Sequence, residues 1–447
     1  MKRRLATVAA ALALALSAAG PLTGTAAGAA RADAIRDLEW GVDGVRAPQA
    51  WGVTQGRGVT VAVLDTGVDA QHPDLTGQVL GGRDLIGFGA GRGDGEWARH
   101  GTAMAGIIAA HGHGPGGGDG VRGVAPAARI LPVRVILEEA DPSRKRARAK
   151  RGGALAEGIR WAADHGADVI NLSLGDDSKT AHPEAGEDAA VQYALAKGVV
   201  VVASAGNSGA KGNRASYPAA YPGVIAVTAV DRDGDRAPFS TRRWYATVAA
   251  PGVDVVIADP DRNYYEGWGT SAAAAFVSGV AALVRSANPD LSPRQVKQLL
   301  QQTARRTPEG GRSDALGAGV VDAGAAVRLA LKTKPQPQRP STAPAKERYF
   351  GPGPTTAGPP GPPAPGGREL GLGVAGLGLL GAAYFAWRRS REPYAEALPW
   401  PDEARPAPAR PPATEAPEAA AAPQAPRPVR PAHPAGLPST RGADESS

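Results

Sequence analysis

The sequence has no cysteine among its 447 residues. This absence excludes disulfide scaffolds, redox Cys-x-x-Cys motifs, thiolate zinc sites and a cysteine nucleophile. Any covalent catalysis by this chain must therefore use an oxygen or a nitrogen atom as the nucleophile. Phenylalanine is also rare, with 5 residues, whereas glycine and proline number 60 and 41. A chain so rich in these two residues is not globular throughout, so part of it must be linker or tail.

A large excess of one charge is missing as well. The 50 basic residues are interspersed with 43 acidic ones, which gives a formal net charge of +7. So small a net charge does not indicate a nucleic-acid partner, and we expect none. Carboxylates at Asp69, Asp74 and Asp84 could ligate calcium, but no ligand pattern is specific enough to predict a site. We therefore name neither a metal nor a cofactor.

The N-terminus has the pattern of a secretory signal peptide. A basic segment directly after Met1 precedes an Ala/Leu run that ends near Ala19, and this run is too short to span a bilayer comfortably. Small-x-small triplets at 27–29 and 30–32 fit signal-peptide cleavage. We expect residues 1–30 to be removed and the chain to be exported, with an uncleaved anchor helix as the alternative.

The C-terminal part begins with a change of composition near residue 332. Residues 332–369 are rich in Pro and Gly and too poor in apolar side chains to fold, which predicts a semi-rigid linker. Residues 370–387 carry no charge and are followed at once by an arginine cluster, which indicates a transmembrane helix with its C-terminal end in the cytoplasm. A buried helix of a soluble domain is the alternative, but no flanking domain is available to bury it. Residues 388–447 lack periodicity, so we expect a disordered cytoplasmic tail.

Between these ends, residues 59–331 have the pattern of an α/β domain. Apolar runs of strand length alternate with helix-length segments, which favours a mostly parallel sheet covered by helices on both faces. The strand candidates are mostly rich in β-branched residues, and the helix candidates carry helix formers or small residues. The expected strands are 59–64, 130–135, 169–172, 199–203 and 224–230, and the expected helices are 154–165, 188–197 and 271–287.

Three motifs place reactive side chains at the ends of such elements. Asp65 ends a buried strand, where a parallel sheet presents its functional residues. His100 begins a small-residue segment that can form a closely packed helix. Ser271 stands at the mouth of a Gly/Ala helix, where its oxygen and its backbone N–H can face one cleft. Each motif alone is weak evidence. An isolated serine at the start of a helix, for example, is most often an N-cap. The chain has no second Asp-Thr-Gly or Asp-Ser-Gly, which argues against an aspartic protease.

The combination and order of these residues are stronger evidence of function than each motif alone. Asp, His and Ser follow one another as in subtilisin, and not in the Ser, Asp, His order of the α/β-hydrolases. Between the histidine and the serine, Asn207 follows a strong strand candidate and offers an amide donor to an oxyanion. A structural loop asparagine is the alternative for that residue. Together the motifs resemble those of the subtilase (subtilisin-like) serine peptidases.

This resemblance implies a subtilisin-like three-layer domain and a serine endopeptidase. Asp65 would orient the imidazole, His100 would act as general base and then as acid, and Ser271 would be the nucleophile. Asn207 and the Ser271 N–H would form the oxyanion hole. The resemblance also implies that a protein or peptide substrate adds as a strand at the cleft. The residues that would edge this cleft are Ser173, Leu174, Gly175, Ala205 and Gly206.

Two features add to or depart from the family pattern. Subtilases usually have Pro four residues after the nucleophile, whereas this chain has Ala275, whose N–H can bond the Ser271 carbonyl and shift the nucleophile. The basic run 144–151 lies between an expected strand and an expected helix, and we expect a solvated, flexible loop there. In the subtilase layout this loop borders the non-primed side of the cleft. It could instead favour acidic residues of the substrate or dock an acidic partner.

The two ends of the chain support a narrower resemblance, to the mycosins, which are membrane-bound subtilases of type VII secretion systems. Their layout is an export signal, a peptidase domain, a Pro-rich spacer, one membrane helix and a short cytoplasmic tail. Residues 31–58 look like their N-terminal extension, which wraps the peptidase. Only about 35 residues separate the expected cleavage site from Asp65, too few for a separately folded propeptide. Mycosins often carry cysteine pairs, so stability here must come from the core alone.

We therefore expect a membrane-anchored serine endopeptidase that acts outside the bacterial plasma membrane, with a type VII secretion membrane complex as its candidate partner. One alternative is a mainly structural subunit that caps or stabilises the secretion complex. Another is a general surface-tethered protease. The short N-terminal segment argues against the latter, because secreted degradative subtilases usually carry a long propeptide.

Overall fold

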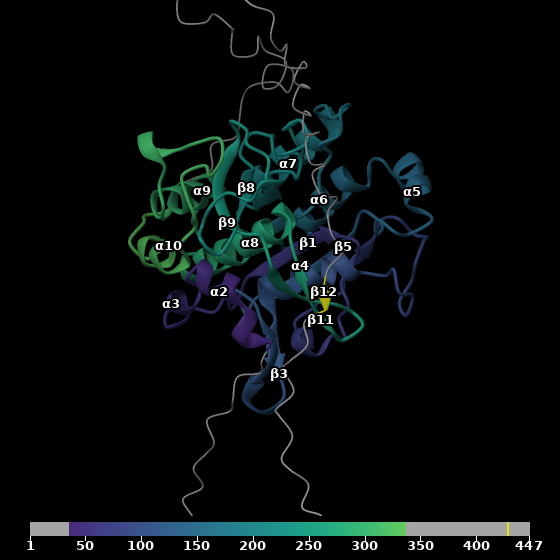
Figure 1. Ribbon diagram of the computed structural model, residues 1–447, viewed down its shortest axis with the longest axis horizontal. Helices are drawn as coiled ribbons and strands as arrows, with labels where there is room; N and C mark the ends of the chain where they lie inside the picture. The colour runs from purple at the N-terminus through teal and green to yellow at the C-terminus, as the bar shows by residue number, and fades with distance from the viewer. Residues whose placement is uncertain (1–34, 337–426, 429–447) are drawn as a thin grey trace, which may run out of the picture. The chain divides into compact units, whose positions relative to one another are not determined.

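A seven-stranded sheet lies at the centre of the structure, a computed structural model that describes residues 35–336 and 427–428 (Figure 1). Its strand order is β2-β5-β1-β6-β7-β8-β9, and all neighbouring strands pair in parallel. Val61 in the middle of the sheet pairs with Ile130 on one side and with Val169 on the other. The strands are β1 Thr60–Asp65, β2 Arg83–Asp84, β5 Arg129–Arg134, β6 Val169–Leu172, β7 Val200–Ser204, β8 Ile225–Val230 and β9 Ala246–Pro251.

The five strands expected from the sequence are the five inner strands of this sheet. All residues of β6, β7 and β8 are buried, which is why each of these strands is a continuous apolar run without alternation. The two outermost strands were not expected. β2 has only two residues, both exposed, and β9 consists mostly of Ala and Pro, which are not typical of strands.

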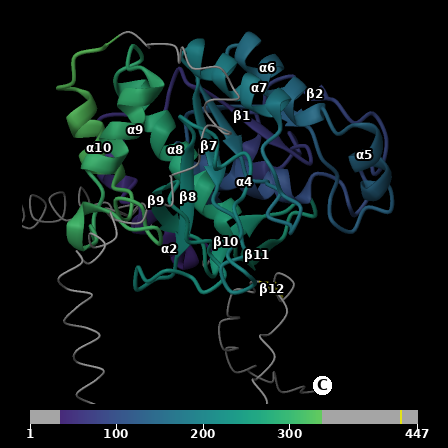
Figure 2. The ribbon, with the colours of Figure 1, turned by 90° about the horizontal axis from the view of Figure 1, so that it is seen from above.

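Helices cover both faces of the sheet (Figure 2). Side chains alternate along β1, so Val61 and Val63 join the core formed with α4 and α8, whereas Leu64 faces α6. On that second face α6 and α7 pack against each other. The expectation of a mostly parallel sheet between two helical layers is therefore confirmed. These helices are α4 Arg99–Ala109, α6 Ala154–Asp164, α7 Ala185–Ala196 and α8 Thr270–Ala287.

The N-terminal segment 35–58 is packed onto this core. Trp40 and Trp51 each donate their indole N–H to a backbone carbonyl of the domain, at 2.9 Å. A Cβ at Gly41 would lie 2.3 Å from the ring of Phe276, so the segment and α8 are in direct contact. Its buried side chains belong to the same apolar cluster as the sheet. Its elements are η1 Arg36–Leu38, α2 Trp40–Gly44 and α3 Pro48–Trp51.

Smaller elements border the sheet. An antiparallel pair is formed by β3 His111–His113 and β4 Asp119–Arg122, and another by β10 Val255–Ala258 and β11 Tyr264–Gly267, which leads into α8. The remaining helices and turns are η2 Pro73–Leu75, η3 Pro115–Gly117, α5 Arg144–Lys150, α9 Pro293–Gln302, η4 Glu309–Gly311 and α10 Ala323–Ala330.

The basic run differs from its expectation, because residues 144–150 form helix α5 and not a flexible loop. Arg, Lys and Ala are good helix formers, so the run becomes helical once both of its ends are held. Ala147 is 4 % exposed and anchors the inner side of the helix. The Asp141 carboxylate fixes the start by accepting the N–H of Ser143 at 2.7 Å and of Ala90 at 2.8 Å.

Several expectations concern residues outside the described part of the chain. The signal peptide (1–30), most of the linker (332–369) and the transmembrane helix (370–387) lie there. Within residues 35–336 the one helix long and apolar enough to cross a membrane is α8, and 78 % of that span is buried in the domain. Of the tail, only β12 (Arg427–Pro428) is described, and its pairing with β11 differs from the expectation of a tail without secondary structure.

Candidate active site

Asp65 lies at the carboxyl end of the central strand β1. Its side chain is fully buried, and its Oδ1 accepts the N–H of Thr66 at 2.7 Å. Both of its carboxylate oxygens also lie next to Nδ1 of His100, at 2.8 and 2.9 Å. A carboxylate can only accept, so Nδ1 carries the proton, and Nε2 of the neutral imidazole is left as an acceptor.

His100 lies in the first turn of α4. Its backbone N–H donates to Glu138 Oε1 at 2.9 Å, and the next N–H, of Gly101, donates to Thr66 Oγ1 at 3.1 Å. No side chain fits at Gly101, because a Cβ there would lie 1.9 Å from the carbonyl oxygen of Gly67. The start of α4 is therefore in direct contact with the loop after β1. This contact fixes the distance between the His100 imidazole and the Asp65 carboxylate.

The pKa of His100 is raised to about 9. Burial lowers this pKa, but the charge of the Asp65 carboxylate and its hydrogen bond outweigh the effect of burial, and Glu138 adds to the rise. The positive charge of Arg144 acts in the opposite direction. The Asp65 carboxylate therefore favours the protonated imidazole, and the fraction of His100 that can accept a proton grows as the pH rises.

Ser271 is the second residue of α8. Gly269, just before the helix, has a φ of 140°, which suits only glycine. The Ser271 hydroxyl donates to the Ser173 carbonyl at 3.1 Å, and the Ser173 hydroxyl donates back to the Ser271 carbonyl at 2.7 Å. Among the described residues there is no hydrogen bond between Ser271 and His100. The hydroxyl must therefore rotate away from Ser173 before it can reach the imidazole.

A buried polar chain supports this pair of serines. The Asn171 amide donates to Ser173 Oγ at 3.0 Å, and Ser278, two turns further along α8, donates to Asn171 Oδ1 at 2.9 Å. Buried polar groups that are all paired in this way hold their neighbours rigidly. Ala275 lies inside the same helix, fully buried, and α8 continues through it without a break. The start of α8 is thus fixed against the end of β6.

Asn207 follows β7 and lies beside the first turn of α8. Its Oδ1 accepts both the N–H and the hydroxyl of Thr270, at 3.0 and 2.9 Å, so its Nδ2 points elsewhere. The position that a Cβ on Gly269 would occupy lies 3.7 Å from Asn207 Nδ2 and also 3.7 Å from the Ser271 nitrogen. Two nitrogen atoms that carry N–H groups therefore lie near one point at the N-terminal end of a long helix, which is a favourable place for negative charge.

The five expected cleft residues continue from two paired strands, β6 and β7. Gly206, at φ 102°, donates its N–H to Thr270 Oγ1 at 3.2 Å, which ties this edge to α8. A Cβ at Gly175 would lie 2.6 Å from Ser216 Oγ, so that edge is packed from behind, whereas the glycine itself is exposed. Ser173, Leu174, Gly175, Ala205 and Gly206 therefore lie at the same edge of the sheet as Asp65, Asn207 and Ser271.

A family model described as the subtilase family matches residues 56–319. The chain belongs to this family of serine endopeptidases. Subtilisin Savinase of Lederbergia lenta is 39 % identical over 295 residues, which cover 66 % of this chain and 100 % of that protein.

Two similar solved structures are mycosins. MycP1 from Mycobacterium smegmatis has a TM-score of 0.56 and 30 % identity, covering 68 % of this chain and 87 % of its own. The MycP3 protease from the type VII (ESX-3) secretion system has a TM-score of 0.54 and 34 % identity, covering 66 % and 89 %.

The motifs did not single out three residues that build this subtilase site. Glu138 holds the backbone of His100, Thr66 holds that of Gly101, and Thr270 holds the amide of Asn207. Glu138 comes shortly after an expected strand beside β1, so its position was a usable signal. The two threonines gave none, because a threonine next to a motif is equally typical of a turn or a helix cap.

The carboxylates considered as calcium ligands have other partners. Asp84 lies 3.3 Å from the Arg134 guanidinium, and Asp69 lies 3.8 Å from that of Arg262. Within residues 35–336 no group of three or more His, Cys, Asp or Glu side chains is placed to hold a metal ion. Asp84 and Asp69 are therefore paired with arginines.

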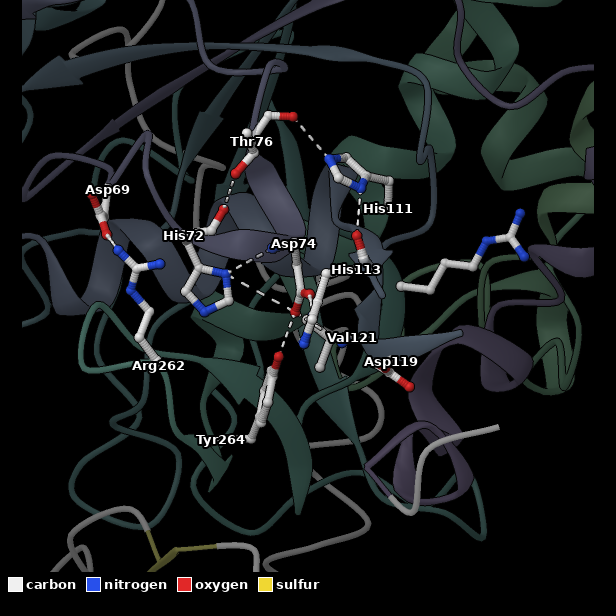
Figure 3. Close-up of polar contacts among 12 residues, drawn as sticks. Asp69, His72, Asp74, Thr76, His111, His113, Asp119, Val121, Arg262 and Tyr264 are labelled. Atoms are coloured by element: carbon white, nitrogen blue, oxygen red, sulfur yellow. Dashed lines mark hydrogen bonds and ion pairs between the residues drawn. The ribbon is translucent and has the colours of Figure 1, made fainter. Parts of the chain in front are cut away.

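Asp74 is the centre of a polar network that links η2 to β3, β4 and β11 (Figure 3). It is fully buried and accepts hydrogen bonds from His113 Nδ1 at 2.6 Å, from the Val121 N–H at 2.9 Å and from the Tyr264 hydroxyl at 2.8 Å. These donors come from β3, β4 and β11. Because β11 leads into Ser271, this carboxylate joins the loop after β1 to the segment that carries the serine.

Proposed function

We propose that this chain is a membrane-anchored subtilase that cuts proteins or peptides outside the bacterial plasma membrane, as a mycosin of a type VII secretion system. In this proposal Asp65, His100 and Ser271 are the catalytic triad. One observation carries the assignment: His100 Nδ1 lies 2.8 and 2.9 Å from the two oxygens of the buried Asp65, which leaves Nε2 free for a serine proton.

The proposed reaction begins when the Ser271 hydroxyl rotates from the Ser173 carbonyl to His100 Nε2. His100 takes the hydroxyl proton while Ser271 Oγ attacks the substrate carbonyl carbon, and Asp65 remains ionised and stabilises the imidazolium. The oxyanion accepts hydrogen bonds from the Ser271 N–H and Asn207 Nδ2, each worth about 3 to 4 kcal/mol in such sites. His100 then gives its proton to the leaving amine. Water next attacks the acyl carbon while His100 takes a proton from it, and His100 returns that proton to Ser271 Oγ as the bond between the acyl group and the serine breaks.

The substrate backbone is proposed to lie in extended form along the cleft edges 173–175 and 205–206. Main-chain hydrogen bonds along such an edge hold any sequence, and pockets for alternate side chains provide selectivity. Both edges are supported from behind, by Ser216 and by Thr270. A pre-formed edge of this kind lowers the entropy cost of binding an extended peptide.

The membrane part of the proposal rests on the sequence. We assign residues 1–30 to a signal peptide, 31–58 to an N-terminal extension, 59–331 to the peptidase domain, 332–369 to a linker, 370–387 to the membrane helix and 388–447 to a cytoplasmic tail. The mycosin neighbours and the packing of the N-terminal segment against α8 support this layout. It requires that the short pairing of β12 with β11 be absent in the membrane, because the two strands would then lie on opposite sides.

The catalytic proposal is tested with the full-length protein purified from membranes in detergent. We expect it to hydrolyse a quenched-fluorescence peptide library. Ser271→Ala should abolish hydrolysis, and Ser178→Ala, a change at an exposed serine after the cleft edge, should leave it intact. A folded wild-type protein that cuts no peptide would contradict the catalytic proposal and favour the structural subunit that caps or stabilises the secretion complex.

The proposed topology can be read directly because the natural chain has no cysteine. In intact cells a membrane-impermeant maleimide should label Ser178→Cys, in the peptidase domain, but should label Ser446→Cys only after permeabilisation. Labelling of both residues in intact cells would refute a cytoplasmic tail.

A general surface-tethered protease is the second candidate function. It is favoured by the 39 % identity with subtilisin Savinase, against 30 % and 34 % with the two mycosins. The two candidates differ in their partners. An affinity-tagged chain isolated from the membranes of its own host should bring type VII secretion subunits with it if it is a mycosin, and none if it is a general protease.

A further inference from the structure

Helix α5 carries a strongly basic surface that the proposed reaction does not use. Four of its basic side chains are exposed to solvent, and within residues 35–336 none of these four has an ion-pair partner. Arg146 lies over the Phe88 ring at 4.7 Å, which leaves its charge available. We call this set the basic patch: Lys145, Arg146, Arg148 and Lys150.

The basic patch has a fixed position. Ala147 is buried beneath it, Asp141 ties the start of the helix to the loop 86–90, and Arg151 at its end donates to the Leu85 carbonyl. A rigid helix holds its charges in one place, whereas a flexible loop would spread them over many positions. The patch can therefore act at a defined distance from a bound peptide.

The same segment reaches the catalytic histidine. Arg144, the first residue of α5, donates to the Leu137 carbonyl. Glu138, which follows Leu137 in the chain, accepts the His100 N–H at 2.9 Å. Arg144 is close enough to both Asp65 and His100 for their ionisation to be coupled electrostatically. A peptide whose scissile bond reaches Ser271 therefore passes within range of the start of α5.

We propose that the basic patch selects substrates that carry acidic residues a few positions from the scissile bond. This inference rests on the proposed peptidase function and names its substrate class. Seven helical residues extend about 10 Å, roughly three residues of an extended peptide, so two or three neighbouring carboxylates can lie along the helix. Complementary charge of this kind raises the rate of encounter as well as the affinity.

The expected size of the effect follows from Coulomb's law. Three charges removed at about 10 Å from a substrate carboxylate, in water, should lower kcat/KM about fivefold at 10 mM ionic strength and about twofold at 0.15 M. A contact through desolvated, specific ion pairs would be larger and less sensitive to salt. The salt dependence of kcat/KM therefore distinguishes long-range attraction of the substrate from direct ion pairing with it. In both cases the basic patch recognises acidic residues of the substrate.

The test uses the full-length protein and three peptides built on one sequence that it cuts: neutral, with an Asp-Glu-Asp block before the scissile bond, and with that block after it. The variant Lys145→Gln/Arg148→Gln/Lys150→Gln should lose the preference for at least one acidic peptide and cut the neutral peptide as the wild type does. The matched control Arg294→Gln/Arg328→Gln/Lys332→Gln removes the same charge from exposed positions on and after α9 and α10, which lie across the domain from α5 (Figures 1 and 2). It should keep the preference.

Charge reversal sharpens the result. Lys145→Glu/Arg148→Glu/Lys150→Glu should prefer a Lys-Arg-Lys block at the position where the wild type prefers acid. Equal kcat/KM of the wild type for all three peptides, or an equal loss in the patch and control variants, would overturn the inference. In both cases peptide cleavage itself would persist, so this failure is distinct from a failure of the peptidase proposal, in which no peptide is cut.

Discussion

The contact between Gly101 and Gly67 offers the sharpest test of how the His100–Asp65 distance is set. A Cβ added at Gly101 would lie 1.9 Å from the Gly67 carbonyl oxygen and 3.3 Å from the Asp65 Cβ. The oxygen is part of the backbone, so no side-chain rotation can relieve the first of these contacts. Gly101→Ala therefore has to separate the start of α4 from the loop behind β1.

The size of the separation can be worked out from these distances. A Cβ comes no closer than about 3.0 Å to such an atom, so the two segments must move apart by about 1.1 Å. That shift takes the 2.8 Å bond between His100 and Asp65 beyond the range of a good hydrogen bond. A misplacement of about 1 Å costs roughly a hundredfold in rate, which corresponds to about 2.7 kcal/mol of transition-state stabilisation.

The assay is kcat/KM of Gly101→Ala on a peptide substrate, together with its melting temperature. Gly95→Ala is the matched control, because nothing lies within 4 Å of a Cβ at Gly95 and its φ is not positive. We expect the control to keep wild-type activity. If folded Gly101→Ala retains activity within twofold of the wild type, the argument that this glycine contact positions the imidazole is refuted.

Four further predictions concern His100, Asp74 and Ala275. Because the pKa of His100 is about 9, kcat/KM should rise about tenfold per pH unit up to about pH 9 and then level off, whereas a profile flat between pH 7 and 9 would contradict this. The folded state holds this proton more tightly than the unfolded chain, so the contribution of His100 to the free energy of unfolding should be complete below pH 6.5 and lost as the pH rises through about 9. Asp74→Asn leaves one acceptor oxygen for three donors and should lower the free energy of unfolding in urea by about 3 kcal/mol; exposed Asp290→Asn is the control, and equal effects of the two changes would argue against the network. Ala275→Pro removes the N–H that bonds the Ser271 carbonyl and should raise kcat, whereas Ala275→Ser, which keeps that N–H, should not; a lower kcat in the proline variant would refute the idea that this bond displaces the nucleophile.

The inner strands could be predicted because the cause of their structure lies in the sequence itself. β1, β6, β7 and β8 are apolar runs buried almost throughout, and β5 is an apolar run between two arginines, so each is recognisable without its neighbours. β9 has no such signal, since its Ala-rich run depends on β8 for pairing and on Ala318 and Val321 for further backbone hydrogen bonds.

Helix α5 could not be predicted from the sequence either. Its sequence has only one buried residue, Ala147, so it lacks the apolar periodicity by which a helix is recognised. What fixes its start is Asp141, which bonds the N–H of Ala90, 51 residues away in the chain. A contact between segments so distant cannot be read from a local pattern.

For the candidate site, the sequence could group residues into a hypothesis but could not give their geometry. The order of Asp65, His100 and Ser271 was enough to group them. The sequence could not show that the Ser271 hydroxyl bonds Ser173, or that Asn171 and Ser278, 107 residues apart, support that pair. These contacts depend on how β6 meets α8, which only the folded chain determines.

The most direct test of the central claim, that Ser271 is an activated nucleophile, is site mapping of a fluorophosphonate adduct. The full-length protein is treated with the reagent at pH 9, digested and analysed by mass spectrometry. We expect one adduct per chain, on the peptide that contains Ser271, with none in Ser271→Ala and a greatly reduced rate in His100→Ala. A folded wild-type protein that forms no adduct, or one that forms its adduct at another serine, would contradict the assignment.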